Sequence, residues 1–182
     1  MNQLHITLEE NSPAIKWANT QADRIGARGH VGTHLDCYTT VPEKPEYNIT
    51  AMVLDCQNEM PKEEDIKSLT TLENMALLLH TANLERNEYG TDMYFSTETF
   101  LSEEVLHTIL EKKPVFIIID SHGIAEKGKR HIEFDKICEA NGCHVIENVD
   151  LSCIGNQKEV QLKILININH QSTGKPCELY CV

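Results

Sequence analysis

The sequence is poor in basic residues and contains no long apolar run. Its 182 residues include 16 Lys and Arg against 28 Asp and Glu, which gives a formal net charge of −12 at pH 7. Nucleic acid and anionic membrane surfaces would repel such a chain, so we expect neither as a partner. No apolar stretch reaches the length of a transmembrane helix. Residues 1–17 lack a basic segment followed by an apolar one, so we expect no signal peptide.

Closely spaced cysteine pairs of the CxxC type are also absent. The seven Cys are an odd number spread along the chain, which does not fit a zinc ribbon or a disulfide framework. Unpaired thiols fit a reducing compartment, so we expect a cytoplasmic protein. Five of them lie among apolar neighbours and are expected to be small buried thiols: Cys37, Cys56, Cys138, Cys143 and Cys153.

Short apolar runs rich in Val and Ile predict buried strands separated by helices. Ser102 is a suitable helix N-cap before Glu103 and Glu104, and Pro114 prevents that helix from continuing. Gly142 is suited to end a second helix. Alternating strands and helices indicate an α/β class, in a single domain over residues 1–182. The predicted strands are 51–54, 115–119, 144–146 and 162–168, and the predicted helices are 62–69, 102–113 and 130–141. Residues 75–80 are a further strand candidate that by composition could equally be a helix.

Metal-binding side chains crowd into one stretch of seven residues. His30, His34 and Asp36 would share a face if this stretch is extended, because side chains alternate along a strand. Gly32, between them, lets another group approach the backbone closely. Two imidazoles and a carboxylate suit Zn²⁺, and less exclusively Mn²⁺ or Fe²⁺. Three protein ligands leave a coordination position open, as catalytic sites do. The alternative is that these are ordinary surface residues.

The same stretch, HVGTHLD, matches every fixed position of the motif HxGTHxD. By this motif the chain resembles the metal-dependent cyclase and kynurenine formamidase family. That resemblance implies a swivelling β/β/α domain with a mixed central sheet, assembled as a homodimer or homotetramer. Further segments are similar in order and spacing over nearly the whole chain: 53–55, 77–95, 114–123, 146–149 and 172–176.

The chain also departs from the family pattern. Family enzymes continue the motif as DxPxH, with the last His as catalytic acid/base, whereas this chain has Tyr38 and Thr40 at those places. A Thr hydroxyl does not ionise near neutral pH and cannot act as the acid/base, so we expect Thr40 to contact the substrate instead. Asp135 stands where the family has a ligand His, and Glu178 where it has an Arg. These departures alter the standard chemistry rather than the metal pocket.

Three residues from the second half of the chain are candidates to complete the pocket. Glu147 matches a ligand Glu of the family and lies in an apolar context, where a lone carboxylate needs a partner or a cation. His131 and Asp135 are four residues apart on a predicted helix and therefore share a face. Either could complete a second metal position. Alternatively, these side chains face solvent.

Two further residues are assigned to the substrate and the chemistry. His122 follows the most apolar predicted strand, at the kind of strand end where functional groups gather in α/β domains. We predict that it is the catalytic acid/base that Thr40 cannot be; the alternative is a structural, hydrogen-bonding His. Trp17, the single Trp, corresponds by resemblance to an aromatic side chain that contacts an aryl substrate, and its alternative is a place in the core.

Two functions fit these residues. The first is a hydrolase of an amide or cyclic amide bond in a small molecule, in which Zn²⁺ or Mn²⁺ activates water and polarises the carbonyl. The second is a catalytically altered relative that binds a metal and a small molecule without formamidase activity. The position of His122 relative to the metal pocket discriminates between them. We expect the hydrolase, because an open metal site activates water by itself.

Overall fold

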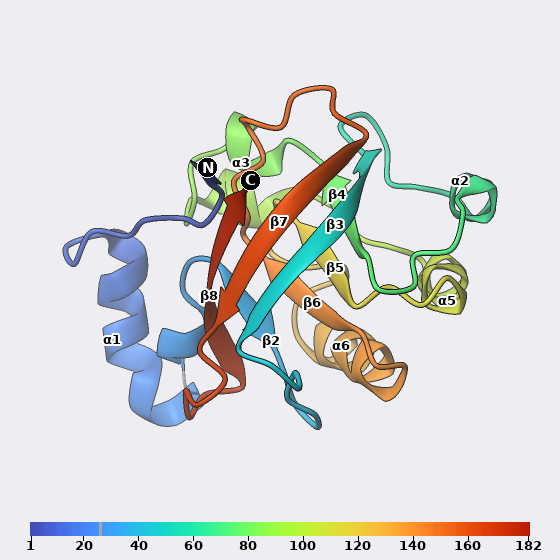
Figure 1. The fold of residues 1–182 in the computed structure, drawn as a ribbon. Helices are drawn as coiled ribbons and strands as arrows, with labels where there is room; N and C mark the ends of the chain where they lie inside the picture. Colours follow the sequence, from blue (N-terminus) through green and yellow to red (C-terminus); the bar gives the residue numbers. More distant parts are fainter. Residues whose placement is uncertain (26) are drawn as a thin grey trace.

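The computed structural model describes residues 1–25 and 27–182, apart from the side chains of Trp17 and of residues 21–27. Its strands form one sheet in the order β1-β8-β2-β6-β5-β4-β3-β7, and β7 also pairs with β8. All strands but β1 therefore close into a barrel (Figure 1). The strands are β1 (Asn2–Gln3), β2 (His34–Asp36), β3 (Glu46–Asp55), β4 (Ala76–His80), β5 (Phe116–Ile119), β6 (His144–Glu147), β7 (Glu159–Ile166) and β8 (Gly174–Cys181).

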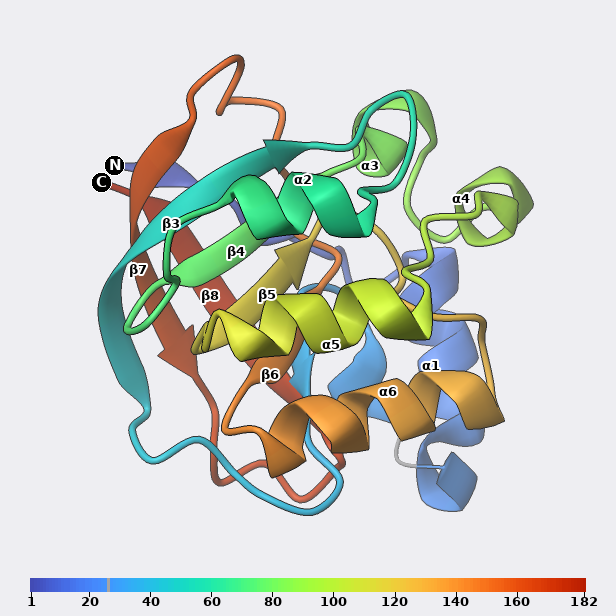
Figure 2. The ribbon, with the colours of Figure 1, turned by 90° about the vertical axis from the view of Figure 1, so that its right-hand side faces the viewer.

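Helices cover one side of this barrel. Strands β3, β4, β5 and β6 are parallel, and a helix follows each of the first three, because a parallel connection must cross over. Figure 2 shows α2, α5 and α6 stacked over β4, β5 and β6. The helices are α1 (Pro13–Ile25), the 3₁₀-helix η1 (Ala27–His30), α2 (Glu63–Ser68), α3 (Asn83–Arg86), α4 (Asp92–Ser96), α5 (Glu103–Glu111) and α6 (Lys129–Ala140).

Two apolar cores lie on the two faces of the barrel wall. In β5, Phe116 and Ile118 join the cluster inside the barrel, while Ile117 and Ile119 join the cluster beneath the helices. A parallel strand buried on both faces is a continuous apolar run, which explains the sequence of β5. In β2, Leu35 belongs to the inner cluster. Its neighbours His34 and Asp36 therefore point to the outer face of the wall.

The predicted α/β class with a mixed sheet is confirmed, and most elements lie where the sequence predicts them. The Ser102 hydroxyl accepts a hydrogen bond from the Val105 N–H as the N-cap of α5. No local pattern predicted α1, η1, β1, or the helical turns α3 and α4, and only the family resemblance of residues 172–176 implied a last strand, β8. The prediction that Cys153 is buried is wrong, because this thiol is exposed. Within the described residues, the helices are too short or too polar to cross a bilayer.

The packing of the barrel interior predicts how core substitutions change the free energy of unfolding. Replacing Ile118, which is fully buried, with Ala should lower the free energy of unfolding by about 2–5 kcal/mol, through lost burial and the cavity left behind. Ile132→Ala is the matched control, since Ile132 lies on α6 and is 37% exposed. It should change stability by about 0.5 kcal/mol or less. Urea unfolding of both variants measures this, and equal midpoints would contradict the assignment of Ile118 to a packed interior.

Candidate metal centre

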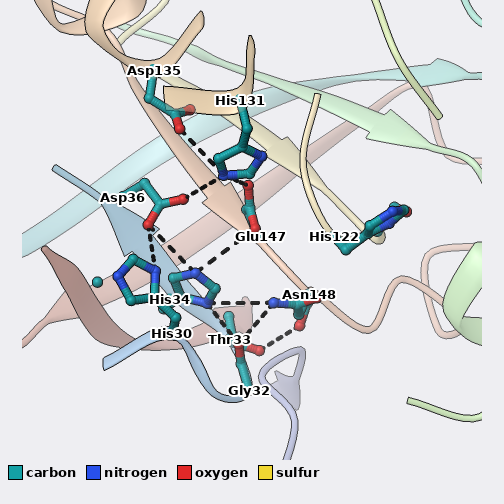
Figure 3. A network of polar contacts seen from close by, with 12 residues as sticks. His30, Gly32, Thr33, His34, Asp36, His122, His131, Asp135, Glu147 and Asn148 are labelled. Carbon is teal, nitrogen blue, oxygen red and sulfur yellow. Dashed lines mark hydrogen bonds and ion pairs between the residues drawn. The ribbon is translucent and has the colours of Figure 1, made fainter. Parts of the chain in front are cut away.

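Three segments distant in sequence meet on the outer face of the barrel wall. His34 and Asp36 project from β2, and Glu147 lies directly across from His34 in the antiparallel register with β6. His131 and Asp135, one turn apart on α6, cover this pair of strands from outside. Figure 3 shows all five side chains pointing toward one another. The structure thus brings together the residues predicted from the two halves of the chain.

His30 reaches the cluster by a route that the sequence analysis did not foresee. The stretch from His30 to Asp36 is not a single extended strand: His30 ends η1, and the chain bends before β2 begins. Nevertheless His30 Nδ1 lies 2.9 Å from Asp36 Oδ1, and its Nε2 lies 2.9 Å from the Thr173 hydroxyl. The expected shared strand face is therefore wrong for His30, although its proximity to Asp36 is right.

Glycines allow the approach of His30. A Cβ added to Gly29 would lie 2.2 Å from the Gly174 carbonyl oxygen, so only glycine lets η1 lie this close to β8. At Gly32 the backbone has a φ of +74°, in the region where a side chain is strained. This turn directs the Gly32 carbonyl toward His34, whose Nδ1 lies 2.9 Å away.

That contact fixes which nitrogen of the His34 ring carries the proton. A carbonyl oxygen can only accept, so Nδ1 carries the proton and Nε2 keeps its lone pair. Nε2 faces the cluster, 3.6 Å from Asp36 Oδ1 and 3.8 Å from Glu147 Oε2, both too far for a hydrogen bond. Burial lowers the pKa of His34, which keeps the ring neutral. A neutral imidazole with a directed lone pair is the form that ligates a metal.

His131 lies among three carboxylates. Its Nε2 is 3.0 Å from Asp36 Oδ2, and 3.3 Å from both Asp135 Oδ2 and Glu147 Oε1. Close packing depends on Gly123, because a Cβ there would lie 2.6 Å from His131 Cε1 and 2.7 Å from Glu147 Oε1. Gly123 was not singled out from the sequence, where a Gly after a strand end resembles any turn glycine.

The mutual burial of these groups shifts their proton affinities. Burial raises the pKa of Glu147 to about 8 and that of Asp135 well above its ordinary value, in each case aided by the Asp36 charge. Burial would raise the pKa of Asp36 too, but His34, His131 and His30 hold it below its ordinary range. Burial would lower the pKa of His131, yet Glu147, Asp36 and Asp135 raise it to about 10.

The cluster has more acceptors than donors. Among the described residues, Asp36 Oδ1, Asp135 Oδ2 and Glu147 Oε1 are buried and accept no hydrogen bond of acceptable geometry. Leaving a buried acceptor unpaired costs about 1–3 kcal/mol, and more for a charged group. A divalent cation would satisfy all three oxygens, and mixed imidazole and carboxylate donors suit Zn²⁺ or Mn²⁺. The residues present therefore fit a metal ion.

Two overlapping sets of ligands are close enough to hold an ion. One is His30, His34 and Asp36, and the other is Asp36, His131 and Asp135; within each set the ligand atoms lie within 4.8 Å of one another. Asp36 belongs to both, so its two oxygens could serve two ions. A third set, His80, Glu85 and Asp120, lies apart from these. There Asp120 already accepts hydrogen bonds from Thr81 and Ala82 and needs no cation.

His122, predicted as the acid/base, lies apart from the five side chains. In Figure 3 its ring points away from them. Its Nδ1 lies 3.0 Å from the Ser121 hydroxyl, and a hydrogen bond to the Phe95 backbone engages the ring as well. The rings of Tyr94, Phe95 and Phe100 surround it. Burial lowers the pKa of His122 to about 4, assisted by Lys127 and His131, so it is neutral at pH 7.

Of the two residues assigned to the substrate, Thr40 makes its described contacts with other parts of the protein. Thr40 is exposed, its N–H donates to Glu139, and its carbonyl oxygen lies 3.1 Å from His144 Nε2. The side chain of Trp17 lies outside the described residues. Sequence reasoning did not single out Glu139, which lies one turn beyond Asp135 on α6.

Comparison with known proteins agrees with this geometry. The model of the cyclase family matches residues 3–126, which include His30, His34 and Asp36. The chain belongs to the cyclase family. This confirms the resemblance that the HxGTHxD motif indicates, and the matched range ends before His131 and Glu147. No curated protein matches this cyclase-family chain in sequence.

Solved structures share its fold over most of its length. A potential metal-dependent hydrolase with cyclase activity has a TM-score of 0.70 at 18% identity, covering 97% of this chain and 94% of that one. Isatin hydrolase A from Labrenzia aggregata, bound to benzyl benzoate, has a TM-score of 0.64 at 14% identity, covering 99% and 92%. A predicted metal-dependent hydrolase from Bacillus stearothermophilus has 0.62 at 18%, covering 84% and 76%. At these identities the likeness establishes the fold.

Replacing His34 with Ala should weaken binding of Zn²⁺ or Mn²⁺ by about 100-fold or more, because it removes a ring nitrogen whose free lone pair faces the cluster. His107→Ala is the control, since His107 lies in the solvent on α5, 3.8 Å from Glu103. Titration calorimetry on folded protein gives both affinities. Wild-type metal binding by the His34 variant would refute the site.

Proposed function

We propose that this cyclase-family protein is a metal-dependent hydrolase of amide or cyclic amide bonds in small molecules. The observation that carries the proposal is the buried cluster in which, among the described residues, three carboxylate oxygens accept no hydrogen bond of acceptable geometry while His34 Nε2 faces them with a free lone pair. Hydrolases of the same fold support it, among them the isatin hydrolase and the metal-dependent hydrolases. Isatin carries a cyclic amide, which is the bond class that the proposal names.

The residues divide into holding and reacting groups. His30, His34 and Asp36 would hold a first ion; Glu147 lies opposite them, and Asp135 serves a second position. When bound, Zn²⁺ or Mn²⁺ supplies Lewis acidity, which makes water nucleophilic near neutral pH and polarises a carbonyl oxygen. The cluster is open to solvent at His30 and His131, whose side chains are 25% and 16% exposed. A small substrate would enter on that side.

His131 is the better candidate for proton transfer to the leaving nitrogen. A general acid must reach the reacting atoms, and the ring of His131 lies at the cluster whereas that of His122 is held away from it. With no ion bound, the surrounding carboxylates raise the pKa of His131 to about 10. This role requires that the second metal position is not filled by His131 itself.

The second candidate function is binding of a metal and a small molecule without formamidase activity. It is favoured by Thr40, which cannot act as an acid/base, and by the engaged ring of His122.

Purified protein loaded with Zn²⁺ or Mn²⁺ should hydrolyse N-formyl anilines or isatin-type cyclic amides. Chelation should abolish the activity and added metal should restore it. His131→Asn should lower kcat about 10²- to 10⁴-fold, as expected for loss of a general acid. His122→Asn, as the control, should leave kcat within a few-fold. A metal-loaded protein that binds these compounds and hydrolyses none of them would establish the second function instead.

A further inference from the structure

One face of α6 follows the chain that leaves β2. His131, Asp135 and Glu139 are spaced four residues apart and share this face. At one end His131 Nε2 contacts Asp36 Oδ2 at 3.0 Å. At the other end the Glu139 carboxylate contacts residues 38–40, the loop just beyond Asp36. These contacts join α6 at two places to the segment that runs from β2 into residues 38–40. The candidate ligands on α6 and on β2 lie at one end of this pair of segments, and Glu139 lies at the other.

The contact at Glu139 is a clamp of five donors on one carboxylate, the weakest of them the Thr40 hydroxyl, 3.5 Å from Oε2. The Tyr38 N–H donates to Oε1 at 2.5 Å, and the N–H groups of Thr39 and Thr40 donate to Oε2, both at 2.6 Å. The Thr39 hydroxyl donates to Oε2 as well. Successive backbone N–H groups that converge in this way form an anion-binding concavity, and bonds to a charged acceptor are the stronger kind. Burial would raise the pKa of Glu139, but these bonds lower it below its ordinary value.

Only Cys37 separates this clamp from Asp36. The thiol of Cys37 is buried on the inner face of the barrel, and its N–H donates to the Thr173 carbonyl at 2.8 Å. Loss of the Glu139 contact would release residues 38–40, which begin two positions after Asp36, whose two oxygens face His30 and His131. On the helix, Glu139 is one turn from Asp135.

We propose that Glu139 is a positioning residue that sets the separation of the metal ligands on β2 from those on α6, and through it the affinity for the ion. The inference rests on the proposed metal-dependent function. Glu139 touches neither ion nor substrate; it acts through Asp36 on one side and through His131 and Asp135 on the other. Groups that orient metal ligands typically change metal affinity 10- to 100-fold when they are lost.

The test compares two identical substitutions on the same helix. Glu139→Gln keeps the shape of the side chain but replaces one of its two oxygens with an NH₂ group. That group cannot accept the backbone N–H bonds that the oxygen accepted. Glu133→Gln is the matched control, because Glu133 is partly exposed and pairs only with Lys129 and Arg130 among the described residues. Binding of Co²⁺ is followed by calorimetry and by visible absorption, at a temperature where both variants are folded.

Glu139→Gln should raise the Kd for Co²⁺ by about 10- to 100-fold and alter the absorption bands, while Glu133→Gln matches the wild type. Amide exchange of residues 38–40 should accelerate in Glu139→Gln alone. A folded Glu139→Gln variant with faster exchange but wild-type Kd and spectrum would overturn the inference and leave Glu139 a brace of the fold. Failure of the wild type to bind Co²⁺, Zn²⁺ or Mn²⁺ would instead overturn the proposed function, and the inference with it.

A milder variant covers the case in which Glu139→Gln does not fold. Thr39→Val removes the Thr39 hydroxyl as a donor to Glu139 and keeps the backbone N–H groups of residues 38–40 in place. It should raise the Kd for Co²⁺ by a few-fold with the fold intact. An unchanged Kd in Thr39→Val, together with an unfolded Glu139→Gln, would contradict a positioning role.

Discussion

The cluster depends on how the charge of buried carboxylates is compensated. Asp36, Asp135 and Glu147 are at most 4% exposed, and each would have to leave water to occupy its place. Such desolvation costs several kcal/mol per ion, which a fold tolerates only where opposite charge and hydrogen bonds offset it. His131 supplies one positive charge, and oxygens of all three carboxylates still lack donors among the described residues. A bound cation would resolve this imbalance, which makes the cluster the candidate metal site.

The fold supplies the rest of the arrangement. Because β2 pairs with β6, His34 faces Glu147 although more than a hundred residues separate them. The crossover from β5 to β6 carries α6 over the same strands and adds His131 and Asp135. Gly32 permits the turn that orients His34, and Gly123 leaves room for His131 beside Glu147. Strand pairing, the crossover helix and the two glycines thus each place a different candidate ligand.

Sequence patterns predicted which candidate ligands lie together better than they predicted the surroundings of those residues. The apolar run of β5, the N-cap at Ser102 and the crowding of His and Asp near residue 34 are local signals, and the structure bears them out. A last strand after residues 172–176 was implied by the family resemblance alone, because Pro176 lowers the strand propensity of a segment in which Cys177 and Leu179 alternate with Glu178 and Tyr180. The role of Glu139 has no local signal, since it binds backbone N–H groups about a hundred residues away, which any residue types could supply. His122 was predicted to be functional because it follows the end of a strand. In the structure, Ser121 and three aromatic rings hold its side chain away from the cluster.

The most direct measurement is a crystal structure of the metal-loaded protein with anomalous diffraction recorded at the absorption edge of zinc or manganese. The account predicts an anomalous peak about 2.0–2.2 Å from both His34 Nε2 and a carboxylate oxygen of Asp36. Loaded crystals without a peak among His34, Asp36 and Glu147, or with the only peak at His80 and Asp120, would contradict it.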